Sequence, residues 1–307
     1  MSVLLTTAFF PPLSWLALAA RDMTLSPDRV LPSVVLLEAC ENYQKQSWRN
    51  RCCILAADGV QMLQVPVVHG GGREVRDASG NQDVRDERGV RNEQGVRNIR
   101  DARNIREVRN IRDARNIRDV RVDYSTPWVV RMQRALDTAY ETSAYYAYYR
   151  DGLFALLDAC PATLWDLNLS TLRWCLSKTG IACELAPTTS FAVPGAPPAG
   201  LDVSPAAGVS TVRTTSPAAG VSTARSSSLA AGVSTVHTPS PAALGAADDY
   251  RYVIHPKRPD TVLASLGLDR PYFQVFRDRL GGFTPGLSCL DLLFNEGPDA
   301  ILWLKRL

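Results

Sequence analysis

The stretch from Glu41 to Cys52 concentrates side chains that bind polar ligands. It reads Glu-Asn-Tyr-Gln-Lys-Gln-Ser-Trp-Arg-Asn-Arg-Cys, with a phenol, an indole, several carboxamides, one lysine and two arginines. The phenol and the carboxamides donate and accept hydrogen bonds, and the cations donate to carboxylates or phosphates. This combination suits anionic or polyhydroxylated ligands. The candidate binding residues are Tyr43, Lys45, Arg49 and Arg51, with a solvated charge cluster as the alternative interpretation of each cation.

Apolar runs on both sides of this stretch predict the elements that position it. Val34 to Leu37 and Cys52 to Ala57 are strand-like, so the polar residues between them fall at strand ends, where binding sites concentrate. We expect one strand over Pro32–Ala39. A hairpin over Arg51–Val68 is expected next, because Asp58-Gly59 is a turn dipeptide between two apolar runs.

The chain opens with a predicted strand, Ser2–Phe10, which Pro11-Pro12 stops, and a predicted helix, Leu13–Arg21. This order is typical of α/β domains. Further elements are expected as a helix that begins at Pro127, helical segments over Leu153–Leu157 and Leu164–Leu176, and a strand over Ile181–Leu185. Together they predict an α/β (or α+β) fold in which helices pack on a small mixed sheet.

Two repeats interrupt this pattern. From Val84 the chain falls into hexads such as Val96–Asp101, with an apolar residue at every third position. A helix needs about 3.6 residues per turn, so these positions form no single buried face, and we expect a solvated insertion, either disordered or a frayed helix. A second repeat, twelve residues long and rich in Ala, Ser, Thr and Pro, has too little large apolar surface to fold and predicts a flexible linker.

Setting the repeats aside leaves about 200 residues, which suits a single domain interrupted by two insertions. The alternative is that the second repeat joins two domains, but the last 60 residues alone would bury a meagre core. The predicted segments are a first core segment (1–72), an Arg-rich insertion (73–121), a helical second core segment (122–193), a disordered linker (194–247) and a third core segment (248–307).

The basic character of the chain is local. Residues 73–121 hold 14 arginines and 10 acids, so their net charge of +4 leaves −1 for the rest of a chain whose total is +3. A nearly neutral core argues against nucleic acid as a partner. Val3–Ala20 is apolar, but no Lys or Arg precedes Arg21 and Pro11-Pro12 interrupts the run, so we expect neither a signal peptide nor a membrane span, and a cytoplasmic location.

Cysteine and histidine usage limits the possible chemistry. The seven cysteines show no Cys-x-x-Cys pair, which favours reduced, buried thiols. Only three histidines are present, and no Gly-rich phosphate loop stands at a strand–helix junction, so we expect neither a metal site nor a cofactor. A cysteine nucleophile, Cys40 or Cys53 paired with His255, is an alternative to the more ordinary inert thiol.

Several separate blocks resemble the WbqC-like protein family, in the family's order. Neither repeat belongs to the family's usual pattern, so both look like insertions at loops. The blocks are Leu4–Pro12, Glu41–Arg51, Asp123–Trp128, His255–Lys257, Tyr272–Phe276 and Leu287–Pro298.

The resemblance implies a role in bacterial surface-glycan synthesis. Members occur in loci for O-antigen and other polysaccharides, and a suggested activity is transfer of a glycine or related aminoacyl group to an amino sugar. We therefore expect a transferase that moves an acyl or aminoacyl group to a sugar or nucleotide-sugar, with glycan-synthesis enzymes as possible partners. The alternative is a non-catalytic protein that binds a glycan intermediate or scaffolds these enzymes, with the repeats as tethers.

Acyl transfer to an amine needs a base and a polarised carbonyl, which suggests roles for the candidate residues. His255 is the only histidine outside the repeats and their edges, and is the expected base. The family pattern has a histidine a few residues after the position of Trp128, where this chain has Met132; if that histidine were the base, this chain would lack it. The expected substrate-binding residues are Tyr43, Lys45, Arg49, Arg51, Trp128, Lys257 and Asn295.

Overall fold

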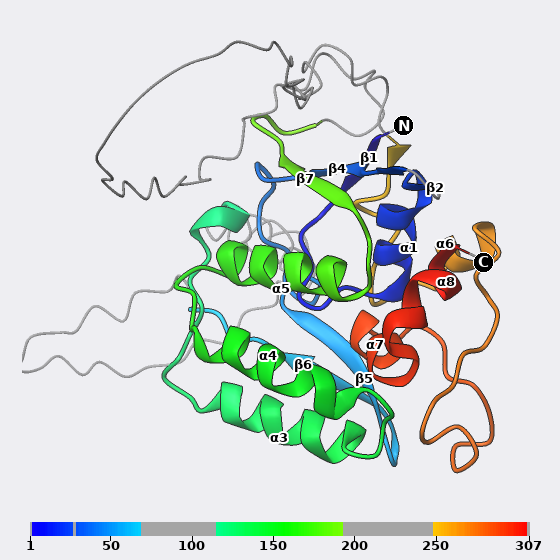
Figure 1. Cartoon of the computed structure of the whole chain (residues 1–307). Helices are drawn as coiled ribbons and strands as arrows, with labels where there is room; N and C mark the ends of the chain where they lie inside the picture. The colour runs from blue at the N-terminus through cyan, green and yellow to red at the C-terminus, as the bar shows by residue number, and fades with distance from the viewer. Residues whose placement is uncertain (1, 27–28, 69–114, 193–247, 306–307) are drawn as a thin grey trace, which may run out of the picture.

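The computed structural model describes residues 2–26, 29–68, 115–192 and 248–305. Its centre is a four-stranded sheet in which every neighbouring pair is parallel (Figure 1). In spatial order the strands are β7 (Cys183–Pro187), β4 (Ser33–Leu37), β1 (Ser2–Leu5) and β8 (Asp248–Asp249).

One face of this sheet carries the main core. Val3, Leu5, Val35 and Leu37 alternate along β1 and β4 and join the large buried cluster, as the two-residue period of a strand requires. Helices cover this face (Figure 1), and the opposite face carries the smaller cluster that includes Leu4 and Leu36. The helices are α1 (Leu13–Arg21), α3 (Trp128–Tyr140), α4 (Tyr146–Asp158), α5 (Leu164–Lys178), α6 (Val262–Ser265), α7 (Cys289–Glu296) and α8 (Ala300–Lys305).

Proline fixes the start of α1. Pro12 takes an extended conformation, with φ −64° and ψ 157°, just before the first helical residue. The eight residues Leu13–Ala20 are all buried, because α6, α7 and α8 pack against this helix in addition to the sheet. The predicted helix Leu13–Arg21 is therefore confirmed.

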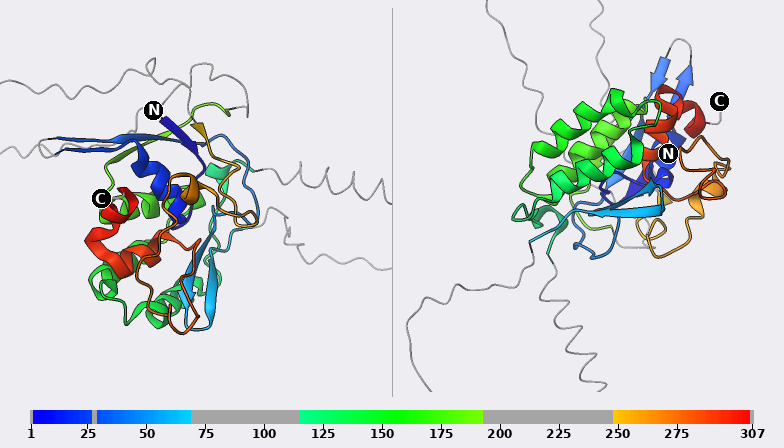
Figure 2. Two further views of the ribbon diagram at one scale, coloured as in Figure 1. Left: turned by 90° about the vertical axis from the view of Figure 1, so that its right-hand side faces the viewer. Right: turned by 90° about the horizontal axis from the view of Figure 1, so that it is seen from below.

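The predicted hairpin is present as a separate antiparallel pair, β5 (Arg51–Ala56) and β6 (Gly59–Gln64). The turn falls at Ala57 and Asp58, and Gly59 has a φ of 124°, a region that favours glycine. Strand β5 packs against α3, and Figure 2 shows α3, α4 and α5 side by side with the hairpin alongside. A second antiparallel pair consists of β2 (Thr24–Ser26) and β3 (Arg29–Leu31).

The α/β prediction is confirmed, with parallel and antiparallel strands in separate sheets. The described residues also include two short 3₁₀ helices, η1 (Ile117–Asp119) and η3 (Gly297–Asp299). Within the described ranges, no helix has the length and apolar character that a membrane span requires. Nor do three or more His, Cys, Asp or Glu side chains gather there as possible metal ligands.

The end of the Arg-rich repeat belongs to the folded core. Ile117 and Val120 are 0% exposed, and the Ile117 amide donates to the Glu41 carbonyl at 3.0 Å. The Tyr43 amide in turn donates to the Arg115 carbonyl at 2.8 Å. Residues 115–121 therefore pack with the core, although the predicted segments place them in the Arg-rich insertion (73–121). The rest of that repeat and the second repeat lie outside the described residues, and the five segment boundaries remain predictions.

Candidate functional site at the carboxyl end of the sheet

The carboxyl ends of the four parallel strands meet at one edge of the sheet. From β1 the chain adds β4 and then β7 on one side, and later adds β8 on the other side of β1. In open α/β sheets, ligands bind outside the carboxyl ends of the strands where the order reverses in this way. A ligand site is therefore expected among the segments that follow β4, β7 and β8.

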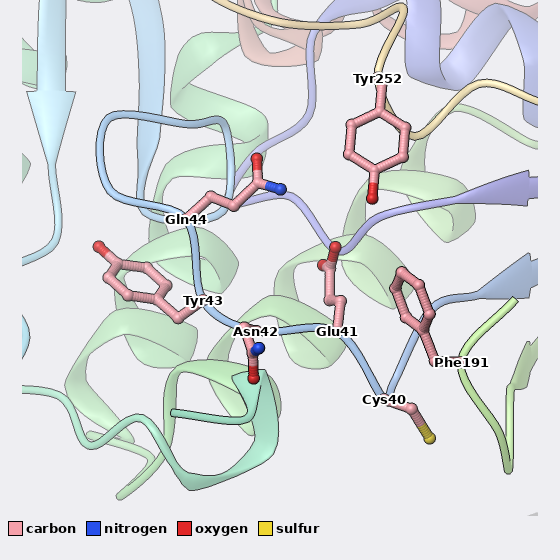
Figure 3. A pocket seen from close by; sticks show the side chains of 7 residues that line it. All are labelled: Cys40, Glu41, Asn42, Tyr43, Gln44, Phe191 and Tyr252. Atoms are coloured by element: carbon pink, nitrogen blue, oxygen red, sulfur yellow. The ribbon is translucent and has the colours of Figure 1, made fainter. Parts of the chain in front are cut away.

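A cavity of about 300 Å³ lies among these segments. The loop after β4 supplies most of its wall, and the segments after β7 and β8 each supply one aromatic ring. In Figure 3 the Tyr252 ring lies above the Glu41 carboxylate and the Phe191 ring lies to its right. The lining residues are Cys40, Glu41, Asn42, Tyr43, Gln44, Phe191 and Tyr252.

A buried ion pair joins two of these segments. Glu38, the residue after β4, is 0% exposed, and its Oε2 accepts a hydrogen bond of 2.6 Å from Arg251 Nη1. Thr188, the residue after β7, donates to Glu38 Oε1 at 2.8 Å. Arg251 Nη2 also donates to Asp249 Oδ2 at 2.7 Å, and this pairing lowers the pKa of Asp249 against the opposing effect of burial. The pair therefore fastens the carboxyl ends of β4, β7 and β8 together.

The same arginine positions the aromatic walls of the cavity. The guanidinium carbon of Arg251 lies 5.1 Å from the centroid of the Phe191 ring and 5.6 Å from that of Tyr252, within the range of cation–π contacts. Its Nη2 also donates to the Ala192 carbonyl at 2.6 Å. Both rings are more than one third exposed, at 43% and 39%, so their outer faces remain open to a ligand.

Glu41 contributes a buried carboxylate to the cavity wall. It is 3% exposed, and its two carboxylate oxygens accept from Nε and Nη2 of Arg49, the first at 2.7 Å. Burial raises the pKa of Glu41, an effect that Arg49 opposes and the neighbouring Glu38 reinforces. Each oxygen keeps a second lone pair, so the carboxylate can still accept a proton. Glu41 is therefore suited to proton transfer with a ligand in the cavity.

Arg49, an expected anion-binding residue, is held by the protein itself. It is 3% exposed and forms the two-pronged pair with Glu41, while its carbonyl accepts from Asn168 Nδ2 at 2.8 Å. The guanidinium of Arg49 therefore binds a carboxylate of the protein itself, that of Glu41. Its part in ligand binding remains a prediction.

The other residues of the Glu41–Cys52 stretch divide between the cavity and the surface. Tyr43 lines the cavity, and burial raises the pKa of its phenol, although Arg51, Arg49 and Arg115 lower it. Its ring points away from Glu41 in Figure 3. Lys45 is exposed, and Arg51 is partly buried with an Nε that has no hydrogen-bond partner among the described residues.

His255 lies in the loop after β8, three residues beyond the cavity residue Tyr252. Its Nδ1 accepts from the Lys257 amide at 3.1 Å, so the proton of the neutral ring resides on Nε2. Partial burial lowers the pKa of His255, with Arg258, Lys257 and Arg49 acting in the same direction, which keeps the ring neutral near pH 7. In this tautomer Nε2 is a hydrogen-bond donor. The Lys257 side chain is exposed, and neither residue lines the cavity.

Trp128 and Asn295 lie elsewhere in the fold. Trp128 is 4% exposed and stacks on Tyr124 at 5.7 Å between ring centroids. Met132, one helical turn later, is buried in the same core, so the side chain at the place of the family histidine packs away from the cavity. Asn295 Nδ2 donates to the Asp291 carbonyl at 2.8 Å within α7. Their roles in substrate binding remain predictions.

The two candidate nucleophilic thiols differ in position. Cys40 is part of the cavity wall, but its sulfur points away from Glu41 in Figure 3 and donates to the Thr188 carbonyl at 3.8 Å. Burial raises the pKa of Cys53, which Arg51 only partly counters, and this disfavours the reactive thiolate. Neither arrangement is that of an activated thiol.

Sequence reasoning assigned no role to several residues of this site. Glu38 carried a usable signal, since an acid directly after a buried strand marks a strand end. Glu41 stood inside the polar stretch, but nothing local showed that it would be buried in a cavity. Phe191, Arg251 and Tyr252 carried no local signal, because the strand β8 that places two of them is only two residues long.

Comparison with known proteins gives one family and no individual relative. The model of the WbqC-like protein family matches residues 32–92 and 106–225, which is more than half of the chain. The blocks Glu41–Arg51 and Asp123–Trp128 fall inside this match, whereas Leu4–Pro12 and His255–Lys257 fall outside it. No curated protein and no solved structure matches the chain. On the family match, the chain belongs to the WbqC-like protein family.

Proposed function

We propose that this protein is a transferase that moves an acyl or aminoacyl group onto the amine of a sugar, and that the Glu41 cavity holds the amine. The observation that carries the proposal is a buried glutamate with a raised pKa in the wall of a cavity that two aromatic rings also line, at the carboxyl edge of a parallel sheet. The setting in bacterial surface-polysaccharide synthesis, such as that of O-antigen, is part of the proposal.

Charge favours an ammonium group as the ligand. Glu38, Glu41 and Asp249 form ion pairs with two guanidinium groups, those of Arg49 and Arg251. With all five groups ionised, this cluster carries one net negative charge. A protonated amine in the cavity compensates that charge and gains from the neighbouring aromatic faces.

The proposed reaction begins with proton transfer. An ammonium group has no lone pair, so it must lose a proton before it attacks, and Glu41 accepts this proton. The amine nitrogen then forms a bond to the acyl carbon. The activating group of the donor leaves with the electrons of the broken bond and takes the second proton that the nitrogen loses as the amide forms. The rings of Phe191 and Tyr252 pack against the apolar face of the sugar, while Asn42 and Gln44 bond to its hydroxyls.

Cations outside the cavity are proposed to hold the anionic part of the donor. Lys45 and Lys257 are exposed, and the Nε of Arg51, which has no partner among the described residues, suits an anion. For His255 the bond at Nδ1 favours a donor role at Nε2, towards the acyl oxygen, over the role of base that the sequence suggests. The two roles of His255 predict different pH profiles.

The test is mass spectrometry of the purified protein with nucleotide-linked amino sugars and a panel of acyl and aminoacyl donors. We expect a sugar product whose mass increases by the acyl group. Glu41→Gln keeps the shape of the side chain and is expected to lower kcat by about 10²–10⁴-fold. Glu141→Gln, at an exposed position, is the matched control and is expected to leave kcat unchanged.

The pH profile identifies the base. If Glu41 is the base, the acidic limb of kcat/KM disappears in Glu41→Gln and persists in His255→Gln. The reverse pattern would make His255 the base. Retention of the sugar without conversion across the whole donor panel would exclude the transferase and favour a binding or scaffolding protein. Thermal melts of each variant separate lost chemistry from lost folding.

A further inference from the structure

A second cavity, of about 390 Å³, lies far from the first in the fold. It is formed at the start of α4, the end of α5 and the 3₁₀ helix η3. Helix α5 ends at Lys178 and β7 begins at Cys183, so this cavity lies towards the amino ends of the strands, opposite the Glu41 cavity. Its lining residues are Tyr145, Tyr148, Tyr149, Ser177, Lys178 and Pro298.

The aromatic walls of this cavity are held in place. A Cβ at Gly297 would lie 2.5 Å from the Tyr145 ring, so only glycine lets that ring pack there. The Tyr145 amide donates to the Phe294 carbonyl at 2.9 Å, which fixes its backbone to α7. On the other wall, Tyr149 packs edge-on against Trp174, with 6.3 Å between centroids. The cavity is therefore formed before a ligand arrives, as small-molecule sites usually are.

The polar groups of the cavity have no protein partners within the described part of the chain. No hydrogen bond or ion pair there engages the hydroxyls of Tyr145, Tyr148 and Tyr149 or the side chains of Ser177 and Lys178. The Tyr148 and Tyr149 rings lie near one another, in an edge-on contact with 5.1 Å between their centroids. Tyr148 is 81% exposed. Hydroxyl groups, a cation and the exposed side chain of Tyr148 thus gather at this cavity without hydrogen bonds or ion pairs to the described part of the chain.

We infer that this cavity binds a saccharide unit that carries a carboxylate or a phosphate. A sugar ring has an apolar face that stacks on an aromatic ring, and its hydroxyls donate and accept, as phenols and serine do. The cation in the cavity wall, Lys178, provides the partner for an anionic substituent. A proline-rich peptide also stacks on tyrosines, and its carbonyls accept from their hydroxyls, but a peptide without acidic residues offers no anion to Lys178.

The test is calorimetric titration of the full chain with three probes: glucose, glucuronate and glucose 1-phosphate. We expect saturable binding of the two anionic probes and weaker binding of glucose. Tyr148→Ala is expected to weaken all three by about tenfold, because one aromatic contact is lost. Lys178→Met is expected to weaken the anionic probes and to leave glucose unchanged. The ratio of the two anionic affinities distinguishes a carboxylate from a phosphate as the preferred group.

Control variants make the result specific to this cavity. Phe273→Ala removes an exposed aromatic ring, 59% accessible, elsewhere on the surface and is expected to change nothing. Glu41→Gln is also expected to leave binding here intact, so failure of the proposed transferase and failure of this inference are separate outcomes. Absence of saturable binding, binding that survives Tyr148→Ala, or binding of a proline-rich peptide in place of the saccharides would overturn the inference.

Discussion

Asp291 is a buried carboxylate that is stabilised by neutral donors. It is 1% exposed, and Tyr140 donates to its Oδ1 at 2.9 Å. Tyr272 and Gln274 donate to its Oδ2 at 2.6 Å and 3.1 Å. Burial raises the pKa of Asp291, and these three hydrogen bonds only partly oppose the increase. The folded protein therefore binds this proton more tightly than the unfolded chain does.

This difference predicts how stability depends on pH. An acid whose pKa is raised by folding stabilises the protein fully below its unfolded pKa, about 3.9 for aspartate, and loses that contribution as the pH rises through the folded pKa. Asparagine does not titrate. We therefore expect the unfolding free energy of wild type, relative to Asp291→Asn, to fall as the pH rises from about 3.5 to about 7. Urea denaturation at each pH measures this difference.

A matched control has the opposite sign. The hydrogen bond from Arg150 lowers the pKa of Asp137, which is partly exposed. Its contribution is present above the unfolded pKa and is lost as the pH falls, so wild type relative to Asp137→Asn should gain stability over the same rise in pH. If the unfolding free energy of wild type relative to Asp291→Asn stays constant or rises with pH, then folding does not raise the pKa of Asp291.

At the scale of elements, the sequence predicted those helices and turns whose ends are set by a nearby proline or turn dipeptide. Proline sets the starts of α1 and α3, and the Asp58-Gly59 dipeptide indicates the β5–β6 turn to within one residue, since the turn residues are Ala57 and Asp58. Strand β8 was not predicted, because Asp248–Asp249 has neither apolar alternation nor β-branched residues. It is a strand only because β1 offers a free edge beside it.

The candidate site was only partly predictable, because it depends on contacts between residues that are far apart in the sequence. The polar stretch correctly indicated a segment between two strands, and Tyr43 from it lines a cavity. However, Arg49 and Glu41 form a pair across eight positions, and Arg251 and Glu38 pair across 213. No local pattern shows which of these charges bond to one another, so the sequence could not separate ligand-binding arginines from those that stabilise buried acids.

The last hexad of the Arg-rich repeat provides a test at the element scale. Ile117, the first residue of η1, is fully buried, so Ile117→Ala is expected to lower the unfolding free energy by about 2–5 kcal/mol. Val130→Ala, at a position that is 44% exposed, is the control and should change it by less than about 0.5 kcal/mol. Denaturant titration compares the two. Equal effects would mean that the core does not extend into the repeat.

At the scale of the whole molecule, the Glu38–Arg251 pair tests how the elements are joined. Arg251→Met leaves Glu38 buried without its cation, and breaking one side of a buried pair costs about 3–5 kcal/mol. The double variant Glu38→Gln with Arg251→Met removes both charges and is expected to recover some of this loss. A double-mutant cycle from urea melts gives the coupling energy, and additive effects would show that the pair does not join the strands.

The position of β1 in the sheet has a consequence for synthesis of the chain. This strand leaves the ribosome long before its neighbour β8 and before Arg251, which fastens the sheet edge. The apolar residues of β1 and α1 must therefore wait for segments made much later, since α6, α7 and α8, which cover α1, also follow β8 in the chain. Such distant pairing slows folding and prolongs exposure of aggregation-prone surface. The edge of β1 that β8 occupies therefore has no partner strand until β8 has been synthesised.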